Sequence, residues 1–238
     1  MTRLLVSVAN FAEAEIAFRA NVDLVDLKNP AAGSLGRPAK ELKLQAVAAK
    51  PSHMVLSCAL GEWHEQADLP IPTGFDYLKF GLSHTRHLEW HSIITQLYSC
   101  LVNNARPVLV CYVDSDLACA PIVQELIPAG LEAGFRTVLL DTFNKSAGKL
   151  STYCDPAQIR NWIELVHEAQ GEIAIGGGIT LENLPEIAAL QPDWVAVRGA
   201  ICLNGLRTNS LDPQRIATAS SLVAAANSAR TSVTAYPE

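Results

Sequence analysis

The stretch Glu172–Ala200 reads EIAIGGGITLENLPEIAALQPDWVAVRGA. It opens with a short apolar run that ends in three glycines, continues with apolar residues at helical spacing over Leu181–Leu190, and closes with a second apolar run, Asp193–Gly199. Short apolar runs bounded by turn residues predict buried strands, and apolar residues three and four positions apart predict a helix that covers them. The stretch therefore predicts a strand, a helix and a second strand parallel to the first.

The same alternation runs through the rest of the chain. Eight apolar runs predict strands: Arg3–Ala9, Asp23–Lys28, His53–Ala59, Phe75–Leu82, Pro107–Val113, Arg136–Thr142, Glu172–Gly177 and Asp193–Gly199. Seven segments predict helices: Phe11–Ala20, Pro38–Lys50, His87–Ala105, Ala120–Gly130, Asp155–Gln170, Leu181–Leu190 and Asp212–Ala229. The connection Gly61–Gly74 lacks helical spacing and predicts a loop.

Eight strand and helix units in one chain favour closure of the sheet into a barrel. We therefore predict a single-domain (β/α)8 TIM barrel that spans residues 1–238. The rival fold, an open doubly wound sheet, would favour a G-x-G-x-x-G turn after the first strand. The sequence has ANFAEAE there, at Ala9–Glu15.

The composition limits the classes of partner. The chain has 238 residues, of which 49% are hydrophobic and 18% charged, and its mean hydropathy of +0.17 suits a large buried core. A formal net charge of −6 and the lack of a long Lys/Arg run argue against binding to nucleic acid or to an anionic membrane. A phosphorylated small molecule stays compatible, because a local pocket can be positive on an acidic protein.

The cysteines and the N-terminus bear on where the protein works. The six cysteines are scattered without a C-x-x-C pair, which is typical of reduced thiols. The opening MTRLLVSVANFAEAEI soon becomes amphipathic, and no window approaches the roughly 20 apolar residues that span a bilayer. We expect a cytoplasmic protein. Three residues, Trp90, Trp162 and Leu203, fit an interface in a homo-oligomer and ordinary helix packing equally well.

The histidines give no sign of a metal site. None of the six forms the H-E-x-x-H spacing of a zinc site, although three cluster in SHTRHLEWH, Ser83–His91. We expect no metal and no cofactor.

Charged residues stand at the carboxyl ends of four predicted strands, where a TIM barrel builds its active site. Period-two alternation places Asp26 and Lys28 opposite Val25 and Leu27, and so directs their side chains into the barrel. The same alternation directs Lys79, Asp141 and Arg198 inward. Lys145 lies on the loop just beyond Asp141.

For one lysine alone, a salt-bridged or snorkelled residue at the end of a strand is the commoner explanation. Convergence of several lysines and aspartates on one barrel mouth favours chemistry instead. Crowding and burial both lower the pKa of an amine, and a neutral amine can attack an aldehyde or ketone to form a Schiff base. Asp26 and Asp141 then hold the remaining ammonium groups and move protons.

Glycine-rich turns predict contacts to phosphate. The turn IGGGIT, Ile175–Thr180, follows the seventh strand and precedes a helix, which matches the phosphate site formed by the last two loops of such barrels. The residues predicted to bind phosphate there are Gly177, Gly178, Arg198 and Gly199. The loop NPAAGSLGR, Asn29–Arg37, offers a second phosphate site through Ser34, Gly36 and Arg37, and its sequence fits a surface turn equally well.

Five segments together resemble the (5-formylfuran-3-yl)methyl phosphate synthase family, also called 4-(hydroxymethyl)-2-furancarboxaldehyde-phosphate synthases. They are LLVSVANFAEAEIA (4–17), VDLVDLKNPAAGSLGR (22–37), DYLKFGL (76–82), LLDTFNKSAGKL (139–150) and WVAVRGAIC (194–202). The resemblance covers nearly the whole chain, and D-x-K-N-P-x-x-G-S-L-G is its most specific part. It implies a TIM barrel that condenses two glyceraldehyde 3-phosphate molecules into a phosphorylated furan aldehyde, with loss of phosphate and water, in methanofuran biosynthesis.

The resemblance also implies roles for residues. The family's Schiff-base lysine falls on Lys28 and its proton-accepting lysine on Lys79. Three more residues match polar active-site positions of the family: Asp26, Asp141 and Lys145. The segment NKSAGKL carries an extra residue relative to the family spacing, so that Lys145 and Lys149 are both candidates for the lysine of this loop.

Two other functions stay open on the residues alone. One is a class I aldolase or phosphosugar isomerase on the same fold, and the other is a non-enzymatic protein that binds a phosphorylated metabolite.

Overall fold

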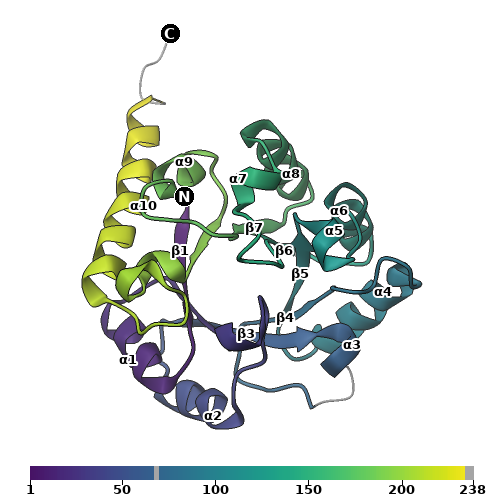
Figure 1. The fold of residues 1–238 in the computed structure, drawn as a ribbon, viewed down its shortest axis with the longest axis horizontal. Coiled ribbons are helices and arrows are strands. Elements are labelled where there is room, and N and C mark those ends of the chain that lie inside the picture. Colours follow the sequence, from purple (N-terminus) through teal and green to yellow (C-terminus); the bar gives the residue numbers. More distant parts are fainter. Residues whose placement is uncertain (67–69, 234–238) are drawn as a thin grey trace.

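Eight parallel strands form the centre of the molecule (Figure 1). The computed structural model describes residues 1–66 and 70–233. The strands are β1 (Arg3–Val8), β2 (Leu24–Leu27), β3 (Val55–Glu62), β4 (Tyr77–Gly81), β5 (Arg106–Tyr112), β6 (Thr137–Asp141), β7 (Glu172–Ile175) and β8 (Trp194–Val197). Each strand pairs with the next, and β1 also pairs with β8, so the sheet closes. The predicted TIM barrel is confirmed.

Helices surround the barrel as an outer ring (Figure 1). The α-helices are α1 (Phe11–Arg19), α2 (Lys40–Ala49), α3 (Trp63–Gln66), α4 (Trp90–Leu101), α5 (Ser115–Ala118), α6 (Val123–Glu132), α7 (Leu150–Tyr153), α8 (Pro156–Glu168), α9 (Leu184–Ala189) and α10 (Pro213–Val233). Three short 3₁₀ turns follow strands β2 and β8: η1 (Pro30–Ala32), η2 (Gly199–Ile201) and η3 (Leu203–Gly205).

Local sequence explains where the helices begin. Asp155 accepts a hydrogen bond from the Gln158 amide at 2.9 Å, and the Gln158 side chain accepts one from the Asp155 amide at 3.1 Å. This reciprocal cap, followed by Pro156 at the first helical position, fixes the start of α8.

The predicted loop 61–74 holds the single-turn helix α3, and its residues 67–69 lie outside the described residues.

Two differences from the prediction concern the strand ends and the short helices. Strand β3 continues to Glu62, three residues past its predicted end, with a register shift against β4 between Ala59 and Glu62. The single-turn helices α5 and α7 were not predicted, because four residues are too few to show helical periodicity.

Alternation along each strand separates two apolar layers. Val25 and Leu27 pack between the barrel and the helices, whereas Leu24 belongs to the barrel interior. Trp90 and Trp162, which also fitted an interface, are buried in the layer between barrel and helices, so helix packing accounts for them. Leu203 is 47% exposed.

All six cysteines are free thiols. Among the helices of residues 1–66 and 70–233, none combines the length and the apolar character needed to cross a membrane.

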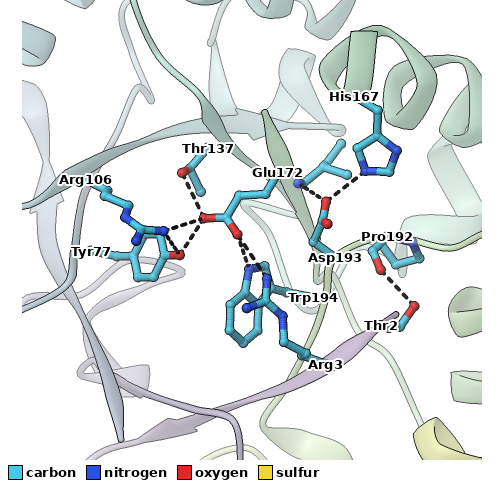
Figure 2. Close-up of polar contacts among 11 residues, drawn as sticks. Thr2, Arg3, Tyr77, Arg106, Thr137, His167, Glu172, Pro192, Asp193 and Trp194 are labelled. Carbon is cyan, nitrogen blue, oxygen red and sulfur yellow. Dashed lines mark hydrogen bonds and ion pairs between the residues drawn. The ribbon is translucent and has the colours of Figure 1, made fainter. Parts of the chain in front are cut away.

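A polar cluster closes the amino-terminal end of the barrel around the Glu172 carboxylate (Figure 2). One carboxylate oxygen accepts from the Tyr77 hydroxyl at 2.5 Å and from the Thr137 hydroxyl at 3.3 Å. The other accepts from the Arg3 guanidinium at 3.1 Å and from the Trp194 indole at 3.0 Å. Arg106 also forms an ion pair with this carboxylate, at 3.7 Å. Because these five partners start five different strands, Glu172 ties the bottom of the barrel together.

Candidate active site

A cavity of about 730 Å³ opens at the carboxyl ends of the strands. Its walls come from β1, β2, β6, β7 and β8 and from the loops that follow the last three. Basic side chains outnumber acidic ones in its lining: Lys28, Lys145, Lys149, Arg198, Arg207 and Arg215 face only Asp141 and Glu182. The excess of positive charge suits an anionic ligand on a protein whose net charge is −6.

Lys28 lies one residue beyond the end of β2 and lines this cavity. Its ammonium group makes no hydrogen bond with any of the described residues, and the residue is 9% exposed. Burial lowers the pKa of Lys28 to about 8, against the opposing effect of Asp141 and Asp26 and with help from Lys145 and Arg207. The structure therefore provides an accessible amine that is partly neutral near pH 8.

Asp141, the last residue of β6, pairs with Lys145 on the loop that follows. The Asp141 carboxylate also accepts from the Thr142 amide at 2.9 Å and from the Ser34 hydroxyl at 3.0 Å. Burial raises the pKa of Asp141, but the ammonium groups of Lys145 and Lys28 outweigh it, and the net shift is downward. Burial lowers the pKa of Lys145, against the pull of Asp141.

Asp114 holds the loop that carries Lys145. Its buried carboxylate accepts from the amides of Phe143 and Asn144, at 2.6 and 2.8 Å. These two bonds fix the backbone directly before Lys145. The sequence analysis missed Asp114, although a carboxylate two residues past the end of a barrel strand is a recognisable signal.

Lys79 and Asp26 form a second ion pair, buried inside the barrel. Lys79 also donates to the Ser57 hydroxyl at 2.7 Å, and Asp26 accepts from the Ser7 hydroxyl at 3.1 Å. Lys79 was predicted at the same mouth as Lys28, but it lines a separate internal cavity of about 20 Å³ instead. Its bonds to Asp26 and Ser57 hold the ammonium group within the barrel.

The glycine turn after β7 presents unused backbone donors. The amides of Gly177, Gly178 and Ile179 make no hydrogen bond with any described residue, and all three residues line the cavity. Gly177 and Gly178 have φ of +95° and +73°, a left-handed conformation that glycine adopts without strain. The amides of Gly199 and Ala200, after β8, are also unbonded within the described part of the chain. Backbone amides that lack a protein acceptor and face a cavity in this way can donate hydrogen bonds to an anion.

Arg198 lines the cavity, yet its five N–H donors are all engaged by protein groups. It binds the Glu13 carboxylate at 2.7 and 3.2 Å and the carbonyl oxygens of three residues: Ser7, Arg207 and Asn209. Its guanidinium therefore supports the loop after β8 and has no donor left for a phosphate. This differs from the phosphate contact that the sequence predicted for its side chain.

Ser34 and Gly36 also differ from their predicted place, since neither lines the cavity. The Ser34 hydroxyl donates to Asp141 and to the Thr142 carbonyl, both at 3.0 Å. A Cβ on Gly36 would lie 2.2 Å from the Asn29 carbonyl oxygen, so glycine is needed there for close backbone approach. Both residues shape the loop after β2.

Among residues 1–66 and 70–233, no three His, Cys, Asp or Glu side chains cluster closely enough to hold a metal ion. The site instead combines the free amine of Lys28, the Lys145–Asp141 pair and unbonded backbone amides, and the Lys79–Asp26 pair lies inside the barrel outside the lining of this cavity. That set of groups can form an imine with a carbonyl compound, move protons beside it and hold an anionic group.

Comparisons with known proteins identify a matching family model and similar enzymes. A family model described as 4-HFC-P synthase matches residues 4–220. The (5-formylfuran-3-yl)methyl phosphate synthase of Methanosarcina barkeri is 30% identical over 222 residues, which cover 88% of this chain and 94% of the relative. The enzyme of the same name from Methanococcus maripaludis (strain S2) is 29% identical over 215 residues, 86% of this chain and 91% of the relative.

Solved structures share the fold. Phosphoribosyl anthranilate isomerase from Thermotoga maritima superposes with a TM-score of 0.65 at 15% identity, covering 94% of this chain and 100% of that one. 3-Hexulose-6-phosphate synthase from Salmonella typhimurium gives a TM-score of 0.60 at 16% identity, with the same coverage. At these identities, the likeness concerns the barrel alone.

Proposed function

Because this chain belongs to the 4-HFC-P synthase family, we propose that it condenses two glyceraldehyde 3-phosphate molecules into (5-formylfuran-3-yl)methyl phosphate, with Lys28 as the covalent amine. We place this reaction in a methanofuran-type biosynthetic pathway. One observation carries the proposal: of the three lysines predicted to be catalytic, Lys28, Lys79 and Lys145, Lys28 alone has no partner within the described residues. It also faces the large cavity.

In the first step, the neutral Lys28 amine attacks the aldehyde carbon of one triose phosphate, and water leaves to give an imine. Protonation of that imine draws electrons from the neighbouring carbon and makes its hydrogen acidic. A base then removes this hydrogen. The Lys79–Asp26 pair is proposed for this role: it lies inside the barrel, outside the lining of the large cavity, and the charge of Asp26 acts on Lys28 and raises its pKa. Asp26 takes one proton from the Lys79 ammonium, and the neutral Lys79 amine then accepts the proton from the substrate carbon.

Loss of the carbon-bound proton gives an enamine, which expels the phosphate from the third carbon. Loss of the hydroxyl proton on the second carbon turns this product into an enolate, whose terminal carbon attacks the second triose phosphate. That second molecule has first isomerised to dihydroxyacetone phosphate, by a shift of its carbon-bound proton from the second carbon to the first. The new bond therefore forms at its ketone carbon, and its phosphate is kept. Cyclisation and loss of water then produce the aromatic furan. Asp141 and Lys145 are proposed to exchange protons with the hydroxyl groups during these steps, because both line the cavity beside Lys28.

The retained phosphate is assigned to the free amides at the ends of β7 and β8. Gly177, Gly178 and Gly199 contribute donors without a side chain in the way, and Arg198 supports their neighbouring loop from behind. Ser34 and Gly36 contribute indirectly in this proposal, by orienting Asp141 and by shaping the loop after Lys28.

Incubation of the purified protein with glyceraldehyde 3-phosphate alone tests the proposal. The expected result is the growth of a furan-aldehyde absorbance together with release of inorganic phosphate. A ketose phosphate product without phosphate release would instead identify an aldolase or isomerase. Binding without any turnover would identify a metabolite-binding protein, and either result would refute the synthase function.

A further inference from the structure

Three arginines line the cavity, and they differ in what their side chains do. Arg215, on α10, donates from Nε to the Ala200 carbonyl at 2.7 Å and so lies on the side of the free amides after β8. All five N–H groups of the Arg198 guanidinium donate to other groups of the protein. Arg207, on the loop between β8 and α10, makes one side-chain hydrogen bond within the described residues, from Nη2 to the Gly33 carbonyl at 3.0 Å. It has no carboxylate partner within 4.0 Å there. Most of its guanidinium is therefore available to a ligand.

The position of Arg207 is fixed from both sides. Arg198 donates to its backbone carbonyl at 2.6 Å, which anchors the main chain, and the bond to Gly33 extends the side chain toward the loop after β2. That loop begins directly after Lys28. The side chain thus extends from the β8 loop toward the loop after β2, and its charge acts on Lys28.

Electrostatics agree with this placement. The positive charge of Arg207 lowers the pKa of Lys28 and of Lys145, and Asp141 opposes the effect of burial on the pKa of Arg207. All four residues line the same cavity.

The proposed reaction involves two phosphate groups, one that leaves from the triose on Lys28 and one that the second triose keeps. The amides at the ends of β7 and β8 are assigned to the retained phosphate. We propose that Arg207 binds the phosphate of the triose attached to Lys28 and stabilises that phosphate as it leaves. This inference rests on the proposed synthase function and adds a leaving-group residue to it.

The step balances without a further reactant. Nitrogen electrons of the enamine form the new carbon–nitrogen double bond, the carbon–carbon double bond shifts, and the bond between the third carbon and the phosphate oxygen breaks. The electron pair stays on the phosphate oxygen, where the fork-shaped guanidinium meets the extra negative charge. A planar, permanently charged group matches that task better than a lysine does.

The test uses Arg207→Gln and Arg207→Lys, with Arg160→Gln on the exposed face of α8 as the matched control. Assays run well above the pKa of Lys28, so that a shift of that pKa does not affect the rates. Phosphate release at saturating glyceraldehyde 3-phosphate is expected to fall about 100-fold or more in Arg207→Gln, and less in Arg207→Lys. The control keeps the wild-type rate.

A second readout separates phosphate contact from loop support. Borohydride trapping with glyceraldehyde, which lacks the phosphate, is expected to label wild type and both Arg207 variants to the same extent. If the Arg207 variants instead lose trapping with glyceraldehyde to the same extent as they lose phosphate release, Arg207 only holds the site together, and the inference is overturned. A higher KM with unchanged phosphate release at saturation would overturn it too, because binding would then not extend to the leaving group.

If the proposed synthase function itself is wrong, the wild-type protein releases no phosphate and forms no furan, which distinguishes that outcome from a failure of the Arg207 inference alone. Should Arg207→Gln not fold, Arg207→Lys keeps the charge, and its phosphate release compared with glyceraldehyde trapping still decides the question.

Discussion

The two ends of the barrel hold charged side chains in opposite ways: one has a half-buried carboxylate with several partners, and the other has a buried lysine without a partner among the described residues. At the amino-terminal end, the Glu172 carboxylate has partners on both oxygens, drawn from five strands (Figure 2). At the carboxyl end, Lys28 points into a cavity of about 730 Å³ without a partner among the described residues. A charge that is fully paired stabilises a unique structure, whereas a buried charge left unpaired keeps its reactivity and costs stability.

The difference reflects what each end has to do. The paired cluster closes the barrel where no ligand enters, and the cation–π contact of Arg3 over Trp194, at 3.6 Å, adds to it. At the open end the Lys145–Asp141 pair lines the same cavity as Lys28, the Lys79–Asp26 pair lies inside the barrel, and neither pair bonds the Lys28 amine. Predictions about the two ends should therefore separate catalysis from stability.

The largest expected effect comes from removing the free amine. Lys28→Ala and Lys28→Arg are expected to lower kcat about 10⁴-fold or more, because neither variant can form the imine. Phosphate release from glyceraldehyde 3-phosphate measures the loss. Lys40→Ala, at an exposed position of α2, is the matched control and should retain full activity.

The next effect concerns the pair at the mouth. Lys145→Met is expected to lower kcat about 10²-fold, since a group that moves protons beside the imine is lost. Lys149→Met should cost less than about tenfold, because Lys149 has no contact with Asp141 and stands at the start of α7. A comparison of steady-state rates separates the two lysines, and a larger loss in Lys149→Met would reverse their assignment.

The pH dependence should show the lowered pKa of Lys28 directly. Below about pH 8 the amine is mostly protonated, so kcat/KM is expected to rise with pH and to level off above that value. Each unit of pH on the acid limb changes the neutral fraction about tenfold. Because Asp141 raises the pKa of Lys28, Asp141→Asn should move the limb to lower pH; a shift to higher pH would contradict this electrostatic account.

The smallest catalytic effect is expected at the closed end. Glu172→Gln removes the negative charge that forms ion pairs with Arg3 and Arg106. It also weakens the hydrogen bonds that the buried side chains of Tyr77 and Trp194 donate to this carboxylate. The free energy of unfolding should fall by about 1–3 kcal/mol, as measured by chemical denaturation. Turnover per folded molecule should stay within about twofold of wild type, and a large loss of kcat would mean that the two ends are coupled.

The sequence allowed much of the barrel and the inward residues to be predicted for a simple reason. Period-two alternation is a local property, and it directed Asp26, Lys28, Lys79 and Asp141 inward, where the structure has them. The predicted strands likewise overlap the observed ones, because each is a short apolar run between turns.

What stayed out of reach depends on contacts far apart in the chain. Arg198 pairs with Glu13, which lies 185 positions earlier, and no local pattern reveals that pair. Ser34 reaches Asp141 across 107 positions. Arg207 stands in an irregular loop without periodicity, so only the folded structure brings it toward Lys28.

The most direct test of the central claim is to trap the intermediate. Wild-type protein is incubated with glyceraldehyde 3-phosphate, reduced with borohydride, digested and analysed by mass spectrometry. The account predicts one substrate-derived adduct, on the peptide that contains Lys28, and none in Lys28→Arg. An adduct on Lys79, Lys145 or Lys149 instead, or turnover without any trapped adduct, would contradict it.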